Sequence, residues 1–355
     1  MLSYTCTLSD FFSCSETGTY LTGKLHNMKR ILLLGGILSM LLATGCSTKS
    51  EKTTQPEEKT QQAPTGGPKL GGPGMGGGHR PIPSPELQAL IDETVPSFKQ
   101  YVFVNEKGDS LQYNLFTPKN IEAGKKYPLV LFMADASTPG PDPLTPLIQG
   151  YGGLVWAAPE FQAKHPAYVL VPQYSYITVD NEWQTMPEVD ETIELLRDIA
   201  GREQIDTNRL YTTGQSMGGM MSLYFNIKYP DVFAASMFVS CQWDVAMMDG
   251  FKDKKFVYIT AGGDREATGG ANQLKALLKK ENASFAEATW SARLPQAEQD
   301  SLAAALLSKG EPRNFITFEG NTVLPKDGKG MVHMASFNFA YRLSPVCDWL
   351  FEQSK

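Results

Sequence analysis

The stretch TTGQSMGGMM places Ser216 between Gly214 and Gly218 in the pattern Gly-x-Ser-x-Gly. A serine hydroxyl becomes a nucleophile only when a base removes its proton and a substrate carbonyl can reach it. RLYTTG (209–214) is typical of a strand, and GGMMSLYFNIKYP (218–230) is typical of a helix. We therefore expect Ser216 on a sharp strand-to-helix turn, a context that favours a nucleophile over a small residue in a glycine-rich loop.

The general base is expected to follow the serine in the chain, as it does in sites built on such a turn. Of the four histidines, His26 and His79 lie outside the predicted domain and His165 precedes the serine. His333 is therefore the candidate base. It follows the glycine-containing loop PKDGKGM and precedes a predicted helix over residues 337–353, so we expect it on a mobile loop.

Asp264 is the candidate for the acid that orients this histidine. It follows a predicted buried strand and stands at the carboxyl edge of the sheet, where α/β active sites assemble. An aspartate there can hold the His333 ring and stabilise the imidazolium. Other carboxylates after the serine remain open as alternatives, namely Asp244, Asp249, Asp253 and Glu266.

A carbonyl oxygen that gains negative charge during the reaction needs N–H donors placed around it. We expect the first donor from Met217, which follows the nucleophile, and a second from the loop after the predicted strand 127–134. Trp183 and Trp243 each follow a predicted strand at its carboxyl end. Together with Gln215 they are the candidate substrate-binding residues.

The segments that must position these residues alternate between strand and helix patterns. Apolar alternation on both sides of Lys107-Gly108-Asp109 predicts an N-terminal antiparallel hairpin. Short apolar runs predict strands at 127–134, 167–174, 209–214, 233–240, 255–263 and 314–320. A helix opens at Pro187, and a second one over 294–310 is either a lid or a packing element. We expect an α/β fold, a mostly parallel twisted sheet with helices on both faces.

Several longer stretches carry a family resemblance over about residues 95–355. They are YPLVLF, VPQY, IDTNRLYTTGQSMGG, YPDVFAA and AGGDREA. The chain resembles the secreted esterase and predicted-peptidase branch of the α/β-hydrolases, which includes relatives of feruloyl esterases and polyhydroxybutyrate depolymerases. The resemblance implies the α/β-hydrolase fold and a site made of Ser216, Asp264 and His333.

One departure from that family lies in the loop that supplies the second oxyanion donor. The family has His-Gly after PLVLF, where this chain has Ala134 and Asp135 in the segment MADAST. The N–H of Ala136 can still complete the oxyanion hole, because the backbone and not the side chain donates. Asp135, however, brings a carboxylate near a site that must stabilise an anion.

The leading hypothesis is a serine hydrolase that cleaves carboxylic esters through an acyl-enzyme, with the ester carried by a small molecule or a polymer. A serine peptidase using the same residues is the first alternative, since the sequence does not show which leaving group is protonated. The second alternative is a non-catalytic lipoprotein that binds a glycan or a peptide, which the altered Ala134-Asp135 loop motivates.

The composition argues against other classes. There are 32 Lys and Arg against 38 Asp and Glu, a net charge of -6, with no basic block apart from Lys29-Arg30, so nucleic-acid binding is not expected. No Cys/His cluster has zinc spacing and no phosphate-binding loop motif occurs. We therefore expect no cofactor and no metal.

The N-terminal region predicts export. A basic pair is followed by an apolar run over 31–42 that is too short to span a bilayer as a permanent helix, so a signal peptide is favoured. Ala43-Thr44-Gly45-Cys46 resembles the lipobox of bacterial lipoproteins, in which the cysteine is lipidated. With Ser47 after it, the resemblance implies a lipid anchor in the bacterial cell envelope, on the outer membrane.

Four regions follow from this interpretation. They are an upstream extension (1–27), a lipoprotein signal peptide (28–45), a disordered tether (46–80) and an α/β-hydrolase domain (81–355). Cys241 and Cys347 are the cysteines of that domain. They permit one disulfide, and two unrelated buried thiols are the expected state.

Overall fold

The computed structural model describes residues 83–355. The predicted extension, signal peptide, lipidated Cys46 and tether therefore lie outside the described residues. Within 83–355, none of the helices has both the length and the apolar character needed to cross a membrane.

A single mixed sheet of nine strands forms the centre of the fold, in the order β1-β2-β4-β3-β5-β6-β7-β9-β8. The β1–β2 and β2–β4 pairs are antiparallel, and the pairs from β4 to β8 are parallel. The strands are β1 Phe98–Val104, β2 Ser110–Phe116, β3 Tyr127–Met133, β4 Tyr168–Gln173, β5 Ile205–Gln215, β6 Ala235–Val239, β7 Phe256–Ala261, β8 Ala286–Trp290 and β9 Arg313–Phe318. The predicted mostly parallel sheet with an N-terminal hairpin is confirmed.

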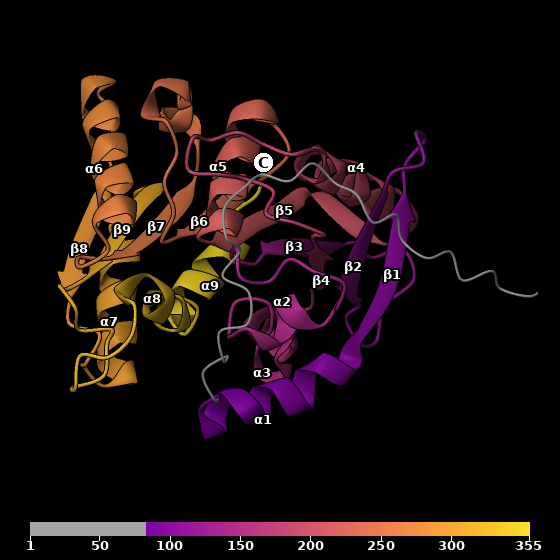
Figure 1. Ribbon diagram of the computed structural model, residues 1–355, viewed down its shortest axis with the longest axis horizontal. Helices are drawn as coiled ribbons and strands as arrows, with labels where there is room; N and C mark the ends of the chain where they lie inside the picture. Colours follow the sequence, from indigo (N-terminus) through magenta and orange to yellow (C-terminus); the bar gives the residue numbers. More distant parts are fainter. Residues whose placement is uncertain (1–82) are drawn as a thin grey trace, which may run out of the picture. The chain divides into compact units, whose positions relative to one another are not determined.

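Helices cover both faces of this sheet (Figure 1). They are α1 Pro85–Thr94, α2 Thr145–Ile148, α3 Pro159–Lys164, α4 Pro187–Arg202, α5 Met217–Lys228, α6 Arg265–Lys280, α7 Gln296–Leu307, α8 Val332–Ala340 and α9 Ser344–Phe351. One apolar cluster joins the sheet to α4, α5 and α6, and the other joins it to the remaining helices. The strands that lead to the Ser216 turn are thus packed between two apolar cores.

The sequence of the central strand β3 does not alternate between apolar and polar residues, because both faces of the strand are buried. All seven of its residues are buried. Val130 and Phe132 face one apolar cluster, while Leu129, Leu131 and Met133 face the other. A parallel strand covered on both faces reads as a continuous apolar run.

The segment 283–314 differs from expectation in one respect. It contains a strand, β8, which the sequence pattern did not predict because AEATW has only two buried residues, Ala286 and Trp290. β8 forms the far edge of the sheet and pairs only with β9 among the described strands, so one sheet neighbour suffices to hold it. Helix α7 in the same segment packs its Ala303 and Leu306 into the core, as a packing element and not as a lid.

Cys241 and Cys347 are both buried and unpaired. Burial raises the pKa of each thiol above its ordinary value, because a thiolate is poorly solvated there.

A buried carboxyl on α4 makes stability depend on pH. Burial, together with the negative charges of Asp109, Glu188 and Glu194, raises the pKa of Glu191 to about 7. The folded protein therefore holds this proton more tightly than the unfolded chain does, and stability is lost as the pH rises from Glu191's ordinary value toward about 7.

We predict that Glu191→Gln removes part of this loss, since an amide carries no charge to desolvate. Urea unfolding at pH 5 and pH 8 should show the variant gaining stability over the parent mainly at pH 8. An equal difference at both pH values would contradict the assigned cause.

Candidate active site

The backbone turn at Ser216 is unusually tight. β5 ends at Gln215 and α5 begins at Met217, so Ser216 alone makes the turn, with φ 52 and ψ -119. L-residues rarely adopt this conformation, and a surrounding structure must hold it in place. The N–H of Ser216 donates to the carbonyl of Val239 at 3.0 Å, which ties the turn to β6. The structure thus places Ser216 on the strand-to-helix turn that its motif predicts.

The two motif glycines are required by close backbone contacts. A Cβ atom at Gly214 would lie 2.2 Å from the carbonyl carbon of Gly218, and one at Gly218 would lie 2.0 Å from the carbonyl oxygen of Met133. Both distances are far below any ordinary contact. The motif therefore lets α5 start directly against the end of β3.

Ser216, His333 and Asp264 form a continuous hydrogen-bonded chain. His333 Nε2 lies 2.8 Å from Ser216 Oγ, and His333 Nδ1 lies 2.6 Å from Asp264 Oδ2. The imidazole is one-third exposed, with 35% of its side-chain surface accessible, whereas the carboxylate is buried at 7%. The structure brings together the three side chains that the sequence selected, in the order nucleophile, base and acid.

Asp264 is fixed by its position between β7 and α6. It is the N-cap of α6, where its Oδ1 accepts from the N–H of Ala267 at 3.3 Å, leaving Oδ2 for His333. Of the alternatives, Asp244 caps a short 3₁₀ helix and Glu266 is exposed. Neither hydrogen-bonds to His333 within residues 83–355.

His333 lies in the first turn of α8, which begins at Val332, so the predicted placement in a loop is wrong. The predicted helix 337–353 is in fact two helices, because the chain bends between α8 and α9. Two serines that sequence reasoning missed hold this turn. Ser336 Oγ donates to the carbonyl of His333 at 2.6 Å and contacts Ser240 Oγ at 2.6 Å. No sequence signal separates them from other buried serines.

The two expected oxyanion donors come from adjacent strands. Met133 at the end of β3 pairs with Gly214 of β5, so the loop that follows β3 runs beside the Ser216 turn. Met217 is the first residue of α5, whose N–H has no partner inside the helix. Within the described chain, neither Met217 nor Ala136 donates its N–H to another residue. Both donors thus stay available near the serine.

Asp135 is buried, with 2% of its surface exposed. Its carboxylate accepts hydrogen bonds from the Ser137 N–H at 2.7 Å, from Gln149 Nε2, and from Gln215 Nε2 at 3.4 Å. Gln215 is itself 2% exposed, which leaves little surface for the substrate contact expected of it.

The two tryptophans differ in their environments. Trp243 is 2% exposed and its ring packs on Tyr224 at 5.6 Å between centroids, so it is a core residue. Trp183 is half-buried, has φ 60, and donates from Nε1 to Gln242 Oε1 at 2.8 Å. Of the two, Trp183 alone has surface to offer a ligand.

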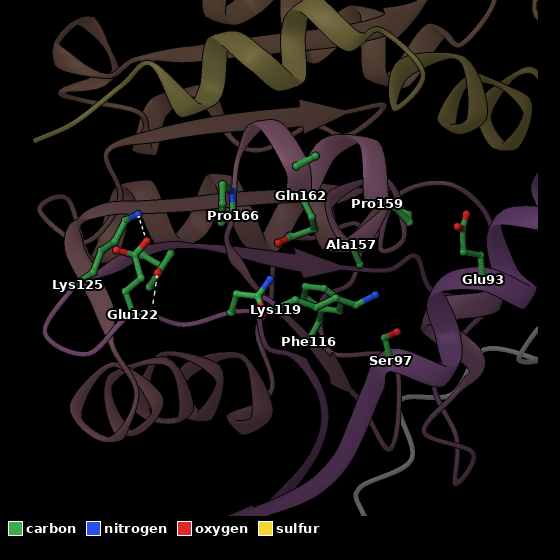
Figure 2. A pocket seen from close by; sticks show the side chains of 13 residues that line it. Glu93, Ser97, Phe116, Lys119, Glu122, Lys125, Ala157, Pro159, Gln162 and Pro166 are labelled. Atoms are coloured by element: carbon green, nitrogen blue, oxygen red, sulfur yellow. Dashed lines mark hydrogen bonds and ion pairs between the residues drawn. The ribbon is translucent and has the colours of Figure 1, made fainter.

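A cavity of about 460 Å³ lies at the opposite edge of the sheet (Figure 2). It is lined by Phe116, which ends β2, and by Tyr127, which begins β3, so it opens at the amino ends of the parallel strands. Its rim carries an exposed ion pair between Lys125 and Glu122 at 2.7 Å. The Ser216 turn stands at the carboxyl ends, and this cavity is not part of its site.

No group of three or more His, Cys, Asp or Glu among residues 83–355 is arranged to hold a metal ion.

The sequence and the fold were compared with known proteins. The family model for the prolyl oligopeptidase family matches residues 178–320. A solved thermostable esterase is similar with 25% identity and a TM-score of 0.60, over 74% of this chain and 64% of that one. The chain thus spans less than two thirds of that esterase's length. A comparison with curated protein sequences finds no significant match.

Two further structures are similar at lower levels. A ferulic acid esterase from Anaeromyces mucronatus has 13% identity and a TM-score of 0.44, over 69% of this chain and 89% of that one. Pyrococcus horikoshii acylaminoacyl peptidase has 13% identity and a TM-score of 0.42, over 73% and 41%. The chain has the α/β-hydrolase fold.

We predict that Gly214→Ala destabilises the protein by about 3 kcal/mol or more, because the new methyl group overlaps the backbone of Gly218. Gly269→Ala is the matched control. It lies within α6, meets no atom within 4 Å, and should stabilise by about 0.5–1 kcal/mol. Denaturant unfolding of both variants checks this, and equal stability of the two would contradict the packing argument.

Proposed function

We propose that this protein is a serine hydrolase that cleaves carboxylic esters by acyl transfer. The hydrogen-bonded chain from Ser216 Oγ through His333 to Asp264 carries the proposal. A serine, a ring nitrogen at 2.8 Å and a buried carboxylate at 2.6 Å from the other ring nitrogen meet the geometric requirements of a catalytic triad. The strained turn at Ser216 adds support, since it presents the hydroxyl at the carboxyl edge of the sheet.

In this mechanism Ser216 Oγ attacks the ester carbonyl carbon while His333 Nε2 takes the hydroxyl proton. Asp264 accepts a hydrogen bond from the Nδ1–H group, fixes the ring's tautomer and stabilises the imidazolium. The N–H groups of Met217 and Ala136 stabilise the oxyanion of the tetrahedral intermediate. His333 then protonates the departing alkoxide, which leaves an acyl group on Ser216. Water, deprotonated by His333, attacks this acyl group and releases the acid.

A serine peptidase with the same residues is the second candidate, favoured by the match of residues 178–320 to the prolyl oligopeptidase family. The esterase similarity extends over more of the chain. We therefore place esters first, and we propose acyl groups on a small molecule or on a plant or microbial polymer as substrates, by analogy with the family that the sequence resembles.

Replacing the proposed catalytic residues should abolish turnover without unfolding the protein. We predict that Ser216→Ala and His333→Ala each lower kcat on p-nitrophenyl acetate by about 10⁴-fold or more, and that Asp264→Asn lowers it by about 10⁴-fold. Arg265→Ala, an exposed neighbour in α6, is the control and should leave kcat unchanged. Turnover that survives Ser216→Ala would rule out the assigned nucleophile.

Ester and amide substrates with the same acyl group separate the two candidates. For a p-nitrophenyl ester and a p-nitroanilide of one acyl group, we expect the ester-to-anilide ratio of kcat/KM to be at least about 100-fold higher for this protein than for a known serine peptidase. A ratio equal to that of the peptidase would favour the second candidate. No turnover of either substrate by folded protein would favour a non-catalytic binding module.

A further inference from the structure

The loop that carries the proposed second oxyanion donor contains a buried carboxylate, Asp135. Burying an ionised carboxylate is costly unless hydrogen-bond donors surround it. Asp135 Oδ1 accepts from the Ser137 N–H at 2.7 Å, and Oδ2 accepts from Gln149 and from Gln215 at 3.4 Å. Both oxygens are therefore engaged, and the charge is directed away from solvent.

The two glutamine side chains also hold each other. Gln215 Nε2 donates to Gln149 Oε1 at 2.9 Å, and Gln149 Nε2 also donates to Ser137 Oγ at 3.1 Å. Each amide nitrogen thus has two acceptors, which for Gln149 are Asp135 and Ser137 and for Gln215 are Asp135 and Gln149. We call Asp135, Gln149 and Gln215 the carboxylate cluster.

This cluster joins the Ala136 loop and the Ser216 turn to helix α2. Asp135 directly precedes Ala136, Gln215 directly precedes Ser216, and Gln149 is the C-cap of α2. The turn around Ala136 is closed by Thr138, whose N–H and hydroxyl both donate to the Asp135 carbonyl, at 3.2 and 2.9 Å. The Asp135 carbonyl shares a peptide plane with the Ala136 N–H, so these bonds hold that N–H in place. The bond from the Ser137 N–H to Asp135 Oδ1 ties the carboxylate to the same turn.

Asp135 has two opposing effects on a reaction that creates an oxyanion. Its negative charge opposes a second negative charge nearby, whereas its hydrogen bonds fix the donor that stabilises that charge. The three donors around the carboxylate offset much of its negative charge, and one of them, the Ser137 N–H, also ties the carboxylate to the loop.

We propose that Asp135 is a positioning residue whose carboxylate, held by Gln149 and Gln215, fixes the Ala136 N–H for oxyanion stabilisation, with a net gain in rate. The inference rests on the proposed function, because it assigns Asp135 a role in the same acyl transfer. It also explains how this chain replaces the His-Gly of the family that its sequence resembles.

Asp135→Asn tests the sign of the net effect. An asparagine accepts on only one side-chain atom, so whichever way its amide turns, an NH₂ group faces a donor of the cluster. We expect kcat on p-nitrophenyl acetate to fall about 10- to 100-fold with KM changed less than about threefold, because a misplaced donor affects the transition state and not substrate binding. Asp142→Asn makes the same change at an exposed aspartate that accepts from the Leu144 N–H, and it should leave both constants unchanged.

A second variant tests the cluster without touching Asp135. Gln149→Met keeps the side-chain length of a partly exposed residue and removes its hydrogen bonds, so it should lower kcat in the same way. The double variant Asp135→Asn/Gln149→Met should lose less than the product of the two single losses, since both act through one cluster. Thermal melting verifies that each variant is folded.

The possible failures are distinct. A kcat of Asp135→Asn that equals or exceeds that of the parent overturns the inference, and an increase would mean that charge repulsion dominates. Fully multiplicative losses in the double variant would also overturn it. If the parent protein shows no turnover that is lost in Ser216→Ala, the proposed function is overturned, and the inference with it.

Discussion

The site depends on one close approach, between the start of α5 and the end of β3. The backbone of Gly218 lies so near the Met133 carbonyl that no side chain fits between them, and Gly214 packs equally closely on Gly218. Beside this contact Ser216 adopts its strained turn conformation, and the Met217 N–H has no partner within the helix because Met217 is the first residue of α5. Because β3 also leads directly into the Ala136 loop, the same contact brings both proposed oxyanion donors to the serine.

The other parts of the site are attached to neighbouring strands of the same sheet. β6 anchors the turn through the Val239 carbonyl, and β7 ends at the segment that carries Asp264. His333 reaches the serine from α8, whose first turn is hydrogen-bonded through Ser336 to Ser240. Residues far apart in the sequence are therefore held by elements that two apolar cores fix on either face. Such a scaffold suits electrostatic stabilisation, which needs donors that do not reorganise during the reaction.

Much of this arrangement was predictable from the sequence, because the constraints involved are local or act by elimination. The glycines around Ser216 specify a tight turn, the apolar runs specify buried strands, and His333 is the histidine that follows the serine. Asp264 followed from the rule that α/β sites assemble at the carboxyl ends of strands.

Features that depend on tertiary contacts were not predictable. The half-exposed strand β8 is held by its pairing with β9, which no local pattern records. His333 lies in the first turn of α8, where Ser336 hydrogen-bonds both to the His333 carbonyl and to Ser240, the residue that follows β6. The burial of Gln215 depends on Asp135 and Gln149, distant residues that meet only in the folded chain.

The central claim is that Ser216 is an activated nucleophile, and labelling of the full chain with a fluorophosphonate probe tests it most directly. Intact-mass measurement followed by peptide mapping should find one adduct on the folded parent, located at Ser216, and none on folded Ser216→Ala. An adduct at another residue, or no adduct on folded parent protein, would contradict the account.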